Sequence, residues 1–145
     1  MKVITWGTRG SLPVAGNSFV RYGGNTTCVE IRSECLPADL AFVIDAGTGF
    51  LPFSLDALGR KVRRIVVPHT HYHHDHTQGM MIAPPIFIDG VELSILGPME
   101  NGWGPKEVYE RLMTPPLHPM SIKKVIHHLT FQGMEEPSTK VIVVH

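Results

Sequence analysis

A run of histidines follows directly on an apolar segment near the middle of the chain, and this arrangement limits strongly how the chain can fold. Residues 64–68, Arg-Ile-Val-Val-Pro, have the apolar, β-branched character of a buried strand. Five of the eight residues from 69 to 76 are histidine. Binding side chains commonly lie on loops that a rigid element holds in place. The sequence therefore predicts a sheet in which the end of one strand holds this run.

The spacing within the histidine run suits metal binding. His71 and His73 lie two residues apart, so both rings can face one ion in an extended or turning segment. Asp75 and His76 are adjacent and can turn toward a second ion. Imidazole and carboxylate ligands together suit zinc, with manganese and iron as alternatives. Two such ions, about 3.5–4 Å apart, can share one hydroxide and clamp a phosphoryl or carbonyl oxygen.

Local patterns along the chain predict an α/β (α+β) fold in one domain spanning residues 1–145. Gly, Pro and Ser make residues 7–24 a long loop. We expect helices over residues 50–58 and 105–113, each with a proline in its first turn, and a short helix starting within residues 78–82. Apolar or alternating segments predict strands, which we expect over residues 2–6, 26–32, 40–45, 64–68, 91–96, 125–131 and 140–145.

Composition and charge exclude several classes of function. The chain has 13 basic and 13 acidic residues, so it lacks the global field that would attract nucleic acid or an anionic membrane. No apolar stretch approaches the length of a membrane span, so no membrane partner is expected. Cys28 and Cys35 are the only cysteines, and no secretory leader precedes them. We therefore expect a reduced, cytoplasmic protein in which Cys28 is packed against apolar neighbours.

Residues 70–76, THYHHDH, resemble the T-H-x-H-x-D-H signature of the metallo-β-lactamase superfamily of metal-dependent hydrolases, and Gly79 completes its D-H-x-x-G extension. Three further segments resemble motifs of the branch that contains phosphodiesterases and tRNA-processing nucleases. They are residues 6–13 (WGTRGSLP), residues 22–28 (YGGNTTC) and residues 45–49 (DAGTG). The resemblance runs in order from residue 2 to about residue 131.

The resemblance implies a role for each matched residue. His71 and His73 would bind the first metal, and Asp75 and His76 the second, with zinc as the expected cofactor. Asp75 would also orient the attacking water, which makes it the expected catalytic residue. Asp45 would support the histidine loop from behind the ligands. The branch implies hydrolysis of a small-molecule or nucleotide phosphodiester by a hydroxide on the metal, in preference to β-lactam or thioester hydrolysis.

Glycines of the matched motifs, such as Gly47 and Gly79, would allow a tight approach of backbone near the metals.

The superfamily's second half has no counterpart here. It supplies a third histidine for the first metal, an aspartate that bridges both metals and a last histidine. The chain ends instead on the apolar residues 141–145, which suggests a truncated domain and half of an αββα sandwich, with a mostly antiparallel or mixed sheet and flanking helices. An uncovered sheet edge and apolar surface would need a cover. We therefore expect a homo-oligomer, or a partner chain that completes the fold.

Three functions remain open at this point: a hydrolase completed by another chain or by His118 or His145, a non-catalytic remnant that keeps the fold and weak metal binding, and metal storage. Histidines outside the signature are expected in other roles. His69 and His74 would be structural or would support the ligands. His127 and His128 fall in the strand expected over residues 125–131. We expect them to be partners of core or surface groups.

Overall fold

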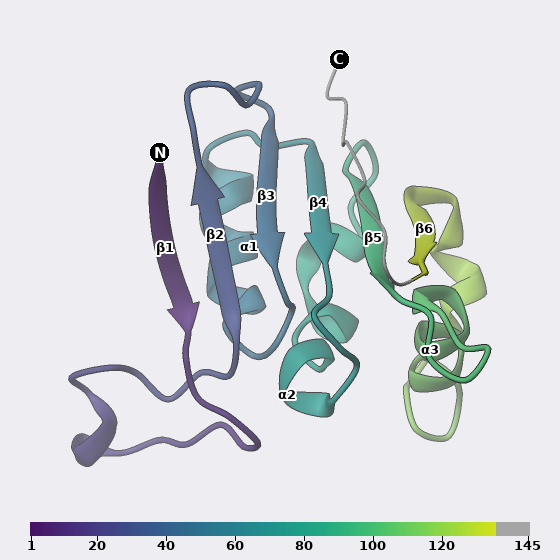
Figure 1. Cartoon of the computed structure of the whole chain (residues 1–145), viewed down its shortest axis with the longest axis horizontal. Coiled ribbons are helices and arrows are strands. Elements are labelled where there is room, and N and C mark those ends of the chain that lie inside the picture. Colours follow the sequence, from purple (N-terminus) through teal and green to yellow (C-terminus); the bar gives the residue numbers. More distant parts are fainter. Residues whose placement is uncertain (136–145) are drawn as a thin grey trace.

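The computed structural model describes residues 1–135, which form a six-stranded sheet with helices and turns packed against it (Figure 1). The strands lie side by side in sequence order. Their bounds are β1 Lys2–Gly7, β2 Cys28–Arg32, β3 Leu40–Ile44, β4 Arg64–Pro68, β5 Glu92–Pro98 and β6 Leu129–Met134. The helices are α1 Phe50–Gly59, α2 His74–Thr77 and α3 Pro105–Leu112, and 3-10 turns lie between them.

The sheet is mixed, which confirms the expected fold class. β1, β2 and β3 pair antiparallel, whereas β3, β4, β5 and β6 pair parallel. Of the two predicted alternatives, mostly antiparallel or mixed, residues 1–135 show the mixed one, because two of the five pairings are antiparallel and three are parallel. Parallel neighbours need a crossover connection. The three connections here contain α1, α2 with its following turns, and α3.

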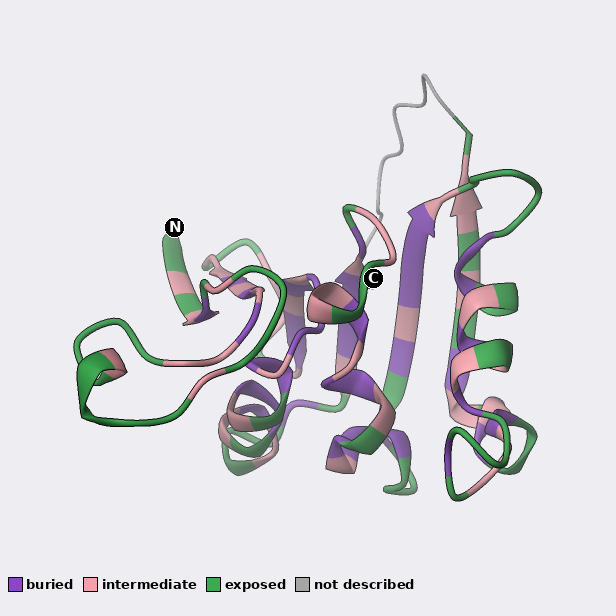
Figure 2. Ribbon diagram, turned by 90° about the horizontal axis from the view of Figure 1, so that it is seen from below, coloured by how far each residue is buried: buried purple, intermediate pink, exposed green. Residues whose placement is uncertain are grey.

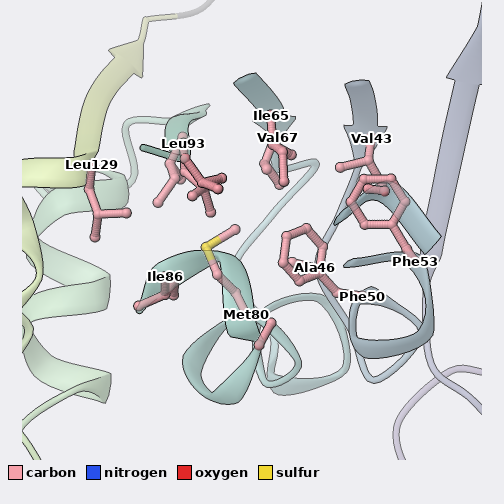
Figure 3. Packing of buried hydrophobic residues seen from close by; sticks show 14 of the residues in the cluster. Val43, Ala46, Phe50, Phe53, Ile65, Val67, Met80, Ile86, Leu93 and Leu129 are labelled. Atoms are coloured by element: carbon pink, nitrogen blue, oxygen red, sulfur yellow. The ribbon is translucent and has the colours of Figure 1, made fainter. Parts of the chain in front are cut away.

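Alternate apolar side chains along the strands point toward the helices and form the main core between the sheet and the helices. Figure 2 shows the buried residues gathered there, while the loop between β1 and β2 is mostly exposed. Phe50 and Phe53 of α1 are fully buried, and each such side chain stabilises the fold by about 1.5–3 kcal/mol. Figure 3 shows how α1, the central strands and the turn after α2 meet, through Val43, Ala46, Phe50, Phe53, Ile65, Val67, Met80, Ile86, Leu93 and Leu129.

The opposite face of the sheet carries a second, smaller apolar cluster. Leu40, Val66 and Leu96 form its buried part, one from each of three neighbouring strands. Phe42 and Met134 pack against them and stay partly exposed. The inner strands are therefore apolar on both faces, which explains why 64–68 reads as a continuous apolar run rather than an alternating one.

Buried charge ties α1 to the sheet. Glu30 of β2 is 1% exposed and accepts hydrogen bonds from Arg60 at 2.6 Å, from Arg32 at 2.9 Å and from the Trp6 indole at 3.0 Å. Asp56 of α1 accepts further bonds from both arginines. This network ties the carboxyl end of α1 to β2.

Most predicted elements are confirmed, and the exceptions are local. The strand over residues 64–68 has the predicted bounds, and both longer helices form. The strand predicted over residues 125–131 starts only at Leu129, because Ile126–His128 form a 3-10 turn. Helix α2 was not predicted, and the short helix expected near residue 80 is the 3-10 turn Met80–Ile82. The strand expected over residues 140–145 lies outside the described residues.

The two cysteines are not joined. Cys28 is buried in the main core, as predicted, and Cys35 is exposed. Burial raises the pKa of the Cys28 thiol well above its usual range, so this side chain stays neutral. Within residues 1–135, no helix combines the length and the apolar character that a bilayer crossing requires.

Candidate metal centre

The histidine run and Asp45 meet because two parallel strands end side by side. β3 ends at Ile44 and β4 at Pro68, and the backbone N–H of Asp45 donates to the Pro68 carbonyl oxygen at 3.0 Å. The chain after β4 therefore passes directly over the residue that follows β3. Polar groups at the carboxyl ends of parallel strands share one edge of the sheet, where ligands commonly bind in open α/β sheets.

Asp45 lies beneath the histidine run and receives hydrogen bonds from two of its residues. The residue is 1% exposed and adopts a left-handed backbone conformation, with φ of 60°. Its carboxylate accepts from the Thr70 backbone N–H at 2.8 Å, from the Thr70 hydroxyl at 2.9 Å and from His76 Nδ1 at 2.8 Å. A non-glycine residue in this conformation costs about 1–3 kcal/mol and persists only where its surroundings hold it.

The pKa of the Asp45 carboxyl lies below its ordinary value. Burial raises this pKa, but contacts with His69, Thr70 and His76 lower it by more than burial raises it. Asp45 is therefore an anion at neutral pH and can only accept hydrogen bonds.

The polar partners of two histidines favour one tautomer of each ring. His76 must carry its proton on Nδ1 to donate to Asp45. The Thr70 hydroxyl donates its single proton to Asp45, so its oxygen can accept from His71 Nδ1, which lies 3.1 Å away. Both His71 and His76 are left with a lone pair on Nε2, the atom that a metal would bind.

The structure brings together all four residues predicted as ligands. The ring centroid of His71 lies 4.4 Å from that of His73 and 4.1 Å from that of His76. The Asp75 carboxylate Oδ2 lies 3.5 Å from His76 Nε2. Three imidazoles and one carboxylate are donor types that suit zinc, and they also suit manganese or iron.

The loop between β1 and β2 contacts this group, which sequence reasoning missed. The backbone N–H of Ser11 donates to Asp75 Oδ2 at 2.7 Å. This hydrogen bond is the main reason why the pKa of Asp75 is lowered. Ser11 is 64 residues from Asp75 in sequence, and only the matched glycine-loop motif around it hinted at a role.

Two glycines allow the backbone segments of the centre to touch, as predicted. A Cβ atom on Gly79 would lie 1.9 Å from the Gly47 carbonyl oxygen. A Cβ on Gly47 would lie 2.1 Å from the Asp75 carbonyl oxygen. These contacts press α2 against the turn after β3, so Asp75 and His76 are held by backbone as well as by side chains.

The remaining histidines of this region have other partners. His69 is 3% exposed, and its Nε2 lies 2.8 Å from the Tyr109 hydroxyl. Burial lowers the pKa of His69, so this ring is neutral. His74 is exposed at the start of α2. Neither is part of the group of predicted ligands.

His118, which sequence reasoning left open as an additional ligand, is occupied elsewhere. It is 6% exposed, its Nδ1 lies 2.8 Å from the Met120 carbonyl oxygen, and its Nε2 lies 3.1 Å from the Met81 carbonyl oxygen. Both ring nitrogens therefore have backbone partners, and His118 does not complete the centre in this arrangement. His145 lies outside the described residues.

Two tyrosines support the histidine run, and neither was singled out from sequence. The Tyr72 hydroxyl donates to the Pro98 carbonyl oxygen at 2.7 Å, which ties the run to the end of β5. Tyr109 is 1% exposed and ties His69 to α3. Tyr72 occupies a variable position of the signature, and Tyr109 looks like an ordinary core residue of an amphipathic helix, so the sequence offered no signal for either role.

No protein-family model matches this sequence, and no curated protein matches it either. The resemblance to the metallo-β-lactamase superfamily therefore rests on the four motifs alone.

Proposed function

We propose that this chain is a metal-dependent hydrolase of the metallo-β-lactamase superfamily, which hydrolyses phosphodiesters at the candidate metal centre. The proposed metal is zinc, as one or two ions, with manganese and iron as alternatives. The observation that carries the proposal is that Nδ1 of His76 lies 2.8 Å from Asp45 and Nδ1 of His71 lies 3.1 Å from the Thr70 hydroxyl. Hydrogen bonds that start at Asp45 occupy Nδ1 of both rings and leave both Nε2 atoms for an ion.

Each residue of the candidate metal centre has a distinct role in the proposed reaction. His71, His73, Asp75 and His76 would hold the metal, which when bound would supply a water acidic enough to ionise near neutral pH. The Asp75 carboxylate, held in place by the hydrogen bond from the Ser11 N–H, would orient that water and fix its direction of attack. Asp45 would keep two rings in their binding tautomers throughout.

A cavity beside Asp75 supports a phosphodiester substrate. It measures about 380 Å³ and is lined by residues of the loop between β1 and β2, namely Thr8, Arg9, Gly10, Ser18, Phe19, Tyr22 and Gly23. Gly10 precedes Ser11, the partner of Asp75, so the cavity adjoins the centre. The Arg9 guanidinium lies 5.1 Å from the Phe19 ring centroid. A cation beside aromatic rings suits an anionic substrate that carries a ring, such as a nucleotide or aryl phosphodiester.

We also propose that the sheet is one half of an αββα sandwich. Helices and turns cover one face, and the cluster of Leu40, Val66 and Leu96 supports a packing partner on the other. A homo-oligomer or a partner chain would supply that partner, together with further metal ligands, because His71 and His73 alone give two of the three protein ligands that catalytic zinc normally has.

Turnover of bis(p-nitrophenyl) phosphate by the zinc-loaded protein tests the proposal. We expect wild type and His74→Ala to hydrolyse this diester, and Asp75→Asn to lose activity by about 100-fold or more, because the metal loses a charged ligand and the water loses the group that orients it. Arg9→Ala should raise KM and leave zinc content unchanged. The matched pair is informative because residues 74 and 75 are adjacent in α2, but only Asp75 contacts the candidate metal centre.

The outcomes separate the two candidate functions. Equal activity of wild type and Asp75→Asn would contradict the proposed site. Bound metal without turnover of any phosphodiester would instead favour the alternative from the sequence, a non-catalytic remnant that keeps the fold and binds metal.

A further inference from the structure

A second group of potential metal ligands lies at the other end of the sheet. Asp89 belongs to the loop that precedes β5, and His127 and His128 belong to the 3-10 turn that precedes β6. β5 and β6 are parallel neighbours, with Leu93 paired to Leu129. Because paired residues near the starts of two parallel strands are level, the segments just before them come side by side.

This position separates the group from the candidate metal centre. The predicted ligands follow the carboxyl end of β4, whereas the second group precedes the amino ends of β5 and β6. Figure 1 shows the segments before β5 and β6 at the opposite end of the strands from α2. A strand of the length of β5, Glu92–Pro98, spans about 20 Å, so the two groups cannot share an ion.

The three side chains already face one another. His128 Nε2 lies 3.1 Å from Asp89 Oδ1, and the His127 and His128 ring centroids are 3.9 Å apart. One ligand atom from each residue lies within 4.8 Å of the other two. Ligand atoms around a tetrahedral zinc ion are about 3.4 Å apart, given bonds of about 2.0–2.2 Å. Small rotations of side chains would therefore suffice to close the group around an ion.

Two of the three side chains are exposed, so they can rotate toward an ion at little cost in free energy. The Asp89 side chain is 98% exposed and His127 is exposed, so both can rotate without disturbing the core. The His128 side chain is only 14% exposed and is the anchored member of the group. The proposed hydrolase uses none of these three residues.

We propose that Asp89, His127 and His128 bind an additional metal ion, a divalent transition metal such as zinc. This site is independent of the candidate metal centre. Two imidazoles and one carboxylate suit this class of ion, and a fourth position stays open for water. The ion connects the loop before β5 to the turn before β6, so it holds the starts of these two strands together. Because it binds the folded state, the ion stabilises that state.

The test measures zinc binding by the full chain after the candidate metal centre has been removed. The background variant carries His71→Ala, His73→Ala and His76→Ala, which leaves Asp75 as the sole remaining predicted ligand, and its fold is checked by circular dichroism. Equilibrium dialysis against zinc chloride at micromolar free zinc should show one bound ion per chain. Adding His128→Gln should weaken this binding at least about tenfold, because even the loss of an outer partner of a ligand has effects of that size. Adding His74→Gln, the matched control, should leave it unchanged.

A second measurement keeps the proposal testable if the background variant does not fold. In otherwise wild-type protein, Asp89→Asn with His128→Gln should remove one zinc ion per chain, and the increase of the melting temperature on zinc addition should become smaller. The proposal is overturned if the background variant binds no zinc, or if His128→Gln and His74→Gln reduce binding equally. The latter result would mean that zinc binds to exposed histidines without a defined site.

Discussion

The contact between Gly79 and Gly47 gives a sharp test of how the candidate metal centre is held. Gly79 has ordinary helical dihedral angles, with φ of −72°, so alanine suits its backbone conformation. The obstacle is space. An alanine Cβ would lie 1.9 Å from the Gly47 carbonyl oxygen and 2.7 Å from the Gly47 carbonyl carbon, and real Cβ atoms essentially never approach within 3.0 Å. Gly79→Ala must therefore push the segment after α2 away from the turn after β3 by at least about 1 Å.

The size of the effect follows from what has to move. Overpacking costs about 1–3 kcal/mol where side chains can adjust. Here the obstructing atoms are backbone, so we expect a loss of about 3 kcal/mol in the free energy of unfolding. For a domain of this size, each kcal/mol lowers the melting temperature by about 2–4 °C. Gly79→Ala should thus melt about 6–12 °C below wild type, measured by circular dichroism on metal-free protein.

Gly59→Ala is the matched control. Gly59 is the last residue of α1, and no atom lies within 4 Å of its would-be Cβ. The same chemical change should there be neutral or stabilising, by up to about 1 kcal/mol, since alanine is the better helix former. If Gly79→Ala melted within a degree of wild type, the close backbone contact would not exist and the description of the centre would be wrong.

Two further substitutions test the supports of the centre. Thr70→Val keeps the shape of the side chain but breaks the link between Asp45 and His71 Nδ1, so zinc affinity should fall about tenfold or more in a competition assay with a fluorescent chelator; an unchanged affinity would refute the tautomer argument. Tyr109→Phe leaves His69 Nε2 buried without a partner and should cost about 1–3 kcal/mol in urea denaturation; a variant as stable as wild type would show that the contact contributes nothing.

The position of the metal-ligand candidates at the end of a strand could be predicted from the sequence, because it depends on local patterns. The apolar run over residues 64–68 identified β4, and the residues after it had to lie at its end. Helix α2 could not be predicted, because its four residues have no apolar periodicity. Backbone contacts with a distant turn hold it in place: Ala46 N–H donates to the His76 carbonyl oxygen, and Gly79 N–H donates to the Ala46 carbonyl oxygen.

The wrong prediction at His127 and His128 has a similar origin. Val125 and Ile126 gave the segment the composition of a strand, but β6 begins only where Leu129 reaches its partner Leu93. The residues before it must turn to enter the sheet, and that turn brings both histidines to the loop of Asp89. Sequence spacing carries no information on this contact, since Asp89 and His127 lie 38 positions apart in the chain.

The zinc content of one matched pair of variants tests the central claim most directly. Both variants carry His128→Gln to remove the second proposed site, and one adds His73→Ala while the other adds His74→Ala. After dialysis at equal free zinc, inductively coupled plasma mass spectrometry should find zinc retained by the His74→Ala protein and lost from the His73→Ala protein. Equal zinc in the two proteins would contradict the account, because His73 would then not be a ligand.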